Sequence, residues 1–117
     1  MKIVRDKISV RELKEVAQEM FGNLVKAVVD VEKKIMVVGG ELHADEEAIL
    51  LEEDSQQKNL WGINIYPHLP QKDWIEFDSI INLKPSQGNR NRSVEDLKIQ
   101  EKITRIVNNL IENENHT

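Results

Sequence analysis

The densest run of chemically active side chains lies in residues 41–54, ELHADEEAILLEED. It holds seven carboxylates and no Lys or Arg, whereas the whole chain of 117 residues has a net charge of −5. If this stretch begins as extended chain, the two-residue period places Glu41, His43 and Asp45 on one face. If it is helical, the four-residue spacing aligns His43 with Glu47 instead. Both alternatives place an imidazole among carboxylates.

An imidazole among carboxylates has two chemical uses. It suits a divalent metal such as Mg²⁺, Mn²⁺ or Zn²⁺, with His43 and Asp45 as ligands and the metal as a cofactor, or it supports acid–base catalysis through a shifted pKa. The spacing matches no established signature such as H-E-x-x-H. The alternative is a solvated acidic turn, because runs of like charge usually lie on the surface. We take His43, Glu41 and Asp45 as the candidate acid, base or metal cluster.

A second candidate is residues 84–93, KPSQGNRNRS, which hold three cations and no acid between an expected strand and an expected helix. A glycine turn, free helix N–H groups and arginine side chains are the parts from which phosphate sites are built. The G-x-x-x-x-G-K-[ST] spacing is absent, and a plain connection with arginines paired to carboxylates is the alternative. The candidate ligand-binding residues are Ser86, Gln87, Gly88, Asn89, Arg90, Arg92 and Ser93.

A third candidate lies on the polar side of two expected strands. Glu76, Asp78 and Asn82 alternate with apolar residues on one strand, as Asn64 and Tyr66 do on another. If these strands pair, the side chains converge, and two carboxylates two residues apart could serve in acid–base catalysis. The alternative is a solvated sheet face, which is common in antiparallel sheets.

The elements that must position these residues follow from periodicity. Ser9 and Glu12 form a capping box that predicts a helix from Val10, and Gly22 ends it. A second helix is predicted over about 94–111, with Ser93 or Asp96 as its cap. Alternation or short apolar runs predict strands at 25–31, 35–38, 48–51, 60–66 and 74–83.

These elements predict a single α+β domain over residues 1–117. We expect a two-layer sandwich of about five mostly antiparallel strands, with the N-terminal and C-terminal helices on one face. With 39% hydrophobic and 32% charged residues, the chain can bury one core. The net negative charge argues against non-specific nucleic-acid binding. No signal-like segment or membrane-length apolar run is present, so we expect a cytoplasmic protein without a membrane partner.

Three blocks of sequence resemble a family of small uncharacterised prokaryotic proteins. They are GGELHADEE at 39–47, LWGINIYP at 60–67 and WIEFDSIINLKPSQGNRNR at 74–92. The resemblance spans most of the chain and implies a small stand-alone bacterial or archaeal protein. It transfers no catalytic role to any residue.

Two functions remain open at this point. In the first, the loop at 84–93 binds a small anionic, phosphate-bearing ligand, while the cluster at 41–47 or the pair Glu76 and Asp78 holds a metal or moves a proton. In the second, the two oppositely charged segments pair with each other, within one chain or across a homodimer. The protein would then be a non-catalytic structural or regulatory interaction module.

Overall fold

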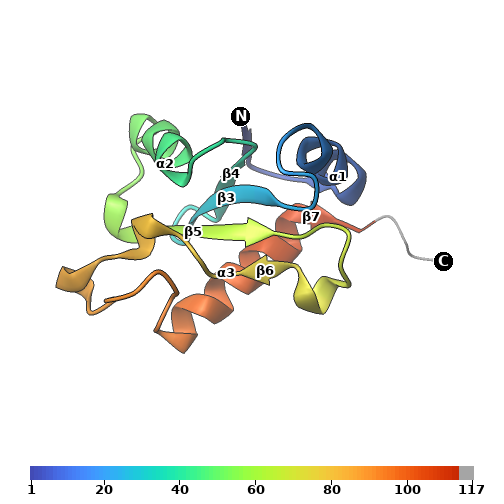
Figure 1. Ribbon diagram of the computed structural model, residues 1–117. Coiled ribbons are helices and arrows are strands. Elements are labelled where there is room, and N and C mark those ends of the chain that lie inside the picture. The colour runs from blue at the N-terminus through green and yellow to red at the C-terminus, as the bar shows by residue number, and fades with distance from the viewer. Residues whose placement is uncertain (114–117) are drawn as a thin grey trace.

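A five-stranded antiparallel sheet organises the computed structural model, which describes residues 1–113 (Figure 1). The strands follow the order β1-β4-β3-β5-β6. Their bounds are Lys2–Val4 (β1), Val25–Asp30 (β3), Ile35–Val38 (β4), Leu60–Ile65 (β5) and Ile75–Glu76 (β6). Two further short strands, β2 (Ile8–Ser9) and β7 (Ile111–Glu112), pair in parallel as a separate ribbon.

Two helices cover one face of this sheet, as predicted. Helix α1 (Val10–Glu19) and helix α3 (Leu97–Leu110) bury an apolar stripe against β3, β4 and β5, and both tryptophans lie in this core. Ser9 is confirmed as the cap of α1, because its Oγ accepts the Glu12 N–H at 3.0 Å, whereas the Glu12 carboxylate binds Lys2 Nζ at 2.9 Å. Asp96 caps α3 by accepting the Lys98 N–H at 2.8 Å. The α+β class and the placement of these two helices are therefore confirmed.

The opposite face of the sheet has a helix that the sequence did not predict. Residues 48–51, expected as a strand, belong to helix α2 (His43–Glu52). Ile49 and Leu50 pack against Val28 and Val37 and form a second, smaller core. A run of four apolar residues does not distinguish strand from helix, whereas acids in the first turn interact favourably with the helix dipole. The strand prediction was therefore wrong.

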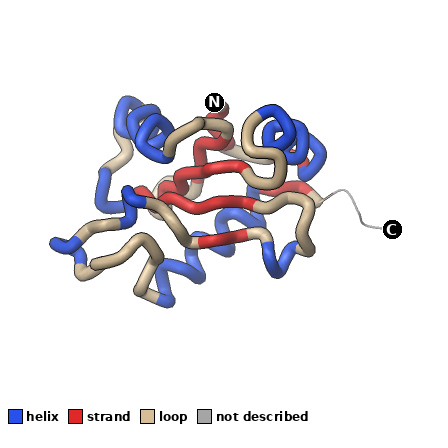
Figure 2. The backbone as a smooth tube through the Cα atoms, in the orientation of Figure 1, coloured by secondary structure: helices blue, strands red, loops and turns tan. Residues whose placement is uncertain are grey.

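The strand expected over 74–83 is also shorter than predicted. Only β6 stays in the sheet, and in Figure 2 its short red segment is followed by a tan loop. The chain then forms a single turn of 3-10 helix, η3 (Ile80–Asn82). The Asn82 side chain continues the pairing, because Gly62 N–H donates to its Oδ1 at 2.8 Å and its Nδ2 donates to the Gly62 carbonyl at 2.9 Å. The Asn82 side chain thus makes the two hydrogen bonds to Gly62 that the backbone of a neighbouring strand would make.

Candidate functional site

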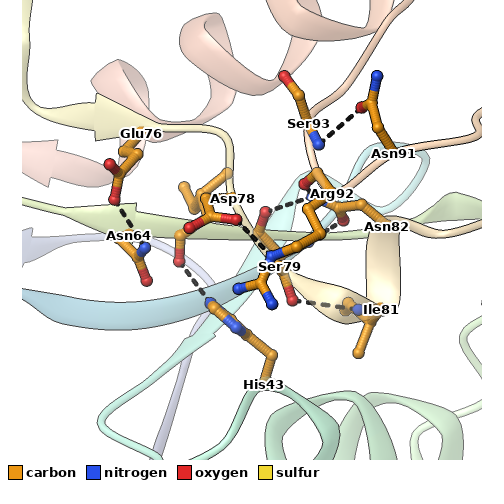
Figure 3. A network of polar contacts seen from close by, with 12 residues as sticks. His43, Asn64, Glu76, Asp78, Ser79, Ile81, Asn82, Asn91, Arg92 and Ser93 are labelled. Carbon is orange, nitrogen blue, oxygen red and sulfur yellow. Dashed lines mark hydrogen bonds and ion pairs between the residues drawn. The ribbon is translucent and has the colours of Figure 1, made fainter.

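Polar side chains occupy the part of the second sheet face beyond the apolar contacts of α2. Three of them form a row across the sheet, because Lys26 on β3 is the register partner of Asn64 on β5, which is the partner of Glu76 on β6. The remaining members come from α2 and from the chain beyond β6 (Figure 3). We define the polar cluster as Lys26, His43, Asn64, Glu76, Asp78 and Arg92.

The third candidate group of the sequence is largely assembled here. Asn64 Nδ2 donates to Glu76 Oε1 at 2.9 Å, and the Tyr66 hydroxyl donates to the same oxygen at 2.8 Å. Burial, and then the contact with Glu76, raises the pKa of Tyr66. The strands pair as the prediction required. Asn82 does not join the group, because its amide is used on the Gly62 backbone.

His43 is the first residue of α2 and its ring lies over β5. The ring Nε2 lies 2.8 Å from the Ile63 carbonyl, which can only accept, so Nε2 carries the proton and Nδ1 is an acceptor. Within residues 1–113 Nδ1 has no hydrogen-bond partner. Burial lowers the pKa of His43, and the positive charges of Lys26 and Arg92 lower it further. The hydrogen bond to the Ile63 carbonyl and the negative charge of Asp78 act in the opposite direction but do not outweigh burial. The ring is therefore neutral at neutral pH.

A glycine makes room for this histidine. A Cβ atom at Gly62 would lie 3.2 Å from His43 Cδ2 and 2.5 Å from Ser79 Cβ. Both side chains therefore rest directly on the bare backbone of β5. The glycine in the block LWGINIYP is thus required first by the close packing of Ser79 and then by that of the imidazole.

Arg92 joins the cluster from the predicted anion-binding loop. Its Nε donates to Asp78 Oδ1 at 2.7 Å, and both side chains stay about half exposed. The two Nη groups have no hydrogen-bond partner within the described chain. The backbone of Arg92 is fixed, because its carbonyl accepts from the Ser79 N–H and from Asn82 Nδ2, each at 3.0 Å. The guanidinium is thus held by Asp78 at Nε, and its two Nη groups, which we call the tip, are open.

The other residues predicted in this loop lie elsewhere. Gly88 makes the expected turn, with φ of +83°, and borders a cavity of about 270 Å³ whose lining includes the carboxylates of Glu95 and Asp96. Ser86, Gln87 and Arg90 are exposed. Asn89 and Ser93 serve the loop itself, with Asn89 Nδ2 donating to the Ser93 carbonyl at 2.7 Å. The acidic residues around this cavity disfavour an anion there. Arg92 is therefore the remaining candidate for anion binding in this loop.

The expected cluster at 41–47 is divided by the start of α2. Glu41 and Asp45 are exposed, whereas His43 is buried against the sheet, so the two-residue alignment does not occur. Across residues 1–113, no three His, Asp or Glu side chains are grouped closely enough to hold a metal ion. Nothing in the structure therefore supports the expected metal site at His43 and Asp45.

The sequence analysis missed Glu46, which lies one turn after His43. This side chain is fully buried; its Oε2 accepts the Gly40 N–H at 2.9 Å, and its Oε1 has no partner. Burial raises the pKa of Glu46 to about 9, although Lys26 and the N-terminal amine act in the opposite direction. The helical spacing of three from His43 was the available signal, but it requires the helix to be recognised first.

The cluster combines an imidazole acceptor, an open guanidinium, two carboxylates and a buried amide. Asn64 is only 8% exposed and its Oδ1 has no partner. This combination can bind a small polar molecule and exchange protons with it.

None of the helices within the described residues is long and apolar enough to span a membrane.

Comparisons with known proteins place the chain in a family and no further. No curated protein matches it, and no solved structure does. A family model described as "Protein of unknown function (DUF5674)" matches residues 2–110, which is nearly the whole chain. This protein therefore belongs to the DUF5674 family.

Proposed function

We propose that the chain binds a small anionic ligand at the polar cluster, with Arg92 as the residue that receives the anion. The observation that carries this proposal is the open tip of the Arg92 guanidinium, which faces the same space as His43 (Figure 3). Two free Nη groups are the geometry that binds a carboxylate or phosphate in bidentate fashion. Of the site predicted at 84–93, the proposal retains only Arg92, which now belongs to the polar cluster on the face of the sheet.

His43 supports an enzymatic role for this site. A neutral imidazole with an unused Nδ1 lone pair is a suitable proton acceptor, and Asp78 lies close enough to affect its pKa. Asp78 also orients Arg92 through the Nε contact. The proposal therefore assigns Arg92 to binding, Asp78 to positioning and His43 to accepting a proton from a bound molecule.

The test is a titration of the ¹⁵N-labelled chain with inorganic phosphate, followed by NMR. We expect the largest shift changes at Arg92 Nε, His43 and Asp78. Arg92→Ala should weaken binding at least tenfold, while Arg90→Ala, an exposed arginine two residues earlier in the same loop, should leave it unchanged. Equal weakening by both variants, or changes confined to the surroundings of Gly88, would contradict the proposal.

A homodimeric interaction module is the competing proposal. The structure offers two outer strands, β1 and β6, as free edges of the sheet. The tryptophans do not add to this case, because Trp61 and Trp74 are 2% and 3% exposed within one chain. Light scattering at several concentrations distinguishes a monomer from a dimer.

The cytoplasm remains our proposed location, which cell fractionation would test.

A further inference from the structure

We infer that the outer edge of β6 binds an extended peptide segment of another protein, which adds to the sheet as a further strand and carries a carboxylate. This surface is separate from the polar cluster, because it lies on the side of the sheet that faces α3. Two features form it: backbone groups of Ile75 that the sheet leaves unpaired, and a cavity beside them.

The backbone of Ile75 points away from the sheet. The Tyr66 N–H donates to the Trp74 carbonyl at 2.8 Å, so these two residues extend the ladder of β5 and β6 as a hydrogen-bonded pair. Bonded and non-bonded pairs alternate in an antiparallel ladder, which makes the next pair, Ile65 and Ile75, non-bonded. β6 is also the last strand of the sheet (Figure 1). The N–H and the carbonyl of Ile75 therefore have no partner within residues 1–113.

A cavity of about 430 Å³ lies beside this edge, and its size is typical of clefts that bind ligands. Its lining comes from β6 and the residue after it, from the single turn of 3-10 helix η2 (Gln71–Asp73) and from α3, and consists of Gln71, Lys72, Ile75, Phe77, Thr104 and Asn108. Ile75 and Phe77 pack against the larger core, so their side chains point to the α3 side of the sheet. Side chains directly opposite each other on neighbouring strands lie on the same face. The residue opposite Ile75 in an added strand would therefore point into this cavity.

Two amide side chains of the cavity are available to a peptide backbone. Within the described part of the chain, the side chains of Gln71 and Asn108 make no hydrogen bond. The same protein shows what such an amide can do, because Asn82 pairs with both backbone groups of Gly62. Gln71 and Asn108 can add hydrogen bonds of this kind to the two that Ile75 offers. Strand addition derives its affinity from such backbone bonds and its specificity from pockets for alternate side chains.

The charge of the cavity favours a segment that carries a carboxylate. Among the described residues, Lys72 is the only charged residue of the lining, and its ammonium forms no ion pair. An acidic side chain or a C-terminal carboxylate can bind it. The cavity beside the other edge strand, β1, differs, because it holds Glu12 and Glu19 and its Lys2 already pairs with Glu12 at 2.9 Å. We therefore assign the peptide to β6.

Affinity selection of random heptapeptides on the intact protein, followed by mass spectrometry, tests this inference. One library has free C-termini and the other has amidated C-termini. We expect selected peptides that alternate apolar and polar residues. Selection from the free library only would identify a C-terminal carboxylate, whereas acidic residues in peptides from both libraries would identify a side chain. No selection from either library would overturn the inference.

Backbone methylation of the strongest peptide tests whether it binds as a strand. Only every second N–H of an added strand faces β6. N-methylation of one alternate set should therefore weaken binding at least tenfold, and N-methylation of the other set should weaken it less than threefold. NMR titration of the ¹⁵N-labelled protein should change the signals of Ile75 and Thr104 most. Equal effects of the two methylated sets, or signal changes away from β6, would overturn the inference.

Substitutions in the cavity provide the controls. Thr104→Arg places a long side chain in the cavity and should weaken peptide binding at least tenfold, whereas Asn109→Arg, exposed on α3 outside the cavity, should not. Lys72→Gln should remove the advantage of a carboxylate over an amide in the peptide. Arg92→Ala should leave peptide binding unchanged, so this test is independent of the proposed anion site. Ile75 signals that shift with protein concentration alone would show a second copy at this edge and would overturn the assignment to another protein.

Discussion

Asn82 pairs with Gly62 as a residue of a neighbouring strand would. Its amide accepts the Gly62 N–H at 2.8 Å and donates to the Gly62 carbonyl at 2.9 Å, so both backbone groups are satisfied by one side chain. The same Nδ2 also donates to the Arg92 carbonyl at 3.0 Å. One buried amide therefore joins the edge of β5 to the loop that carries the proposed anion-binding residue.

We predict that Asn82→Ala destabilises the protein by about 2–4 kcal/mol. Asn82 is fully buried, and each buried polar group that loses its partner costs about 1–3 kcal/mol. Urea unfolding followed by circular dichroism measures the change. Asn109→Ala, on the exposed side of α3, is the control and should stay within about 0.5 kcal/mol of wild type. Equal stability of the two variants would show that the amide is not needed.

Gly62→Ala should also destabilise the fold, by about 1–3 kcal/mol, for a different reason. The new methyl group would lie 2.5 Å from Ser79 Cβ and 3.2 Å from His43 Cδ2, so both side chains must move. Gly88→Ala is the comparison, because space is open there and only its φ of +83° opposes the change. The ¹H and ¹⁵N shifts of the His43 ring should change in the first variant only. Unchanged His43 signals in Gly62→Ala would contradict the packing described.

Glu46 makes stability depend on pH. Its pKa is about 9 in the folded chain and about 4.5 when exposed, so the folded state holds the proton more tightly. Its contribution is complete below pH 4.5 and is lost as the pH rises toward 9. Glu46→Gln keeps a neutral side chain at every pH, so unfolding free energy should fall less steeply over this window and exceed the wild-type value at pH 7 by about 1–3 kcal/mol. A wild-type curve that rises between pH 5 and 9 in parallel with the variant would refute this.

His43 gives a local test of how the cluster is arranged. Its pKa is lowered in the fold, so its neutral form contributes stability above pH 6.5, which is lost as the pH falls below that value. NMR titration of the ring should show that Arg92→Ala raises this pKa, because a positive charge is removed, and that Asp78→Asn lowers it. Arg90→Ala should not change it. A lower His43 pKa in Arg92→Ala, or a higher one in Asp78→Asn, would contradict this arrangement of charges around the ring.

Much of the fold can be predicted from the sequence because its signals are local. The cap at Ser9 and the alternation along 25–31 each specify an element within a few residues. Helix α2 lacks such a signal, because it joins a buried acid, Glu46, to a run of four apolar residues. Neither a helical stripe nor a clear alternation results. Only packing against the sheet decides its conformation.

The site depends even more on distant contacts. The contact of Asn64 with Glu76 could be expected once the two strands were assumed to pair, and the structure contains it. The position of Arg92 could not, because it follows from a chain that leaves the sheet after Glu76 and is held by the side chain of Asn82. No periodic pattern records such a path. The first function predicted from the sequence combined His43 with the loop of Arg92, but their spacing along the chain did not indicate how the two side chains would meet.

The second sheet face is divided between an apolar part and a polar part, which separates stability from the proposed binding. Apolar contacts of Leu50 and its neighbours hold α2 in place, whereas Glu76, Asp78 and Arg92 are at least partly exposed and lie outside both cores. Substitutions at these three positions should therefore alter the proposed ligand site while leaving the hydrophobic interior intact. If the proposed site is correct, its ligand preference can be altered by few mutations, without compensating changes in either core.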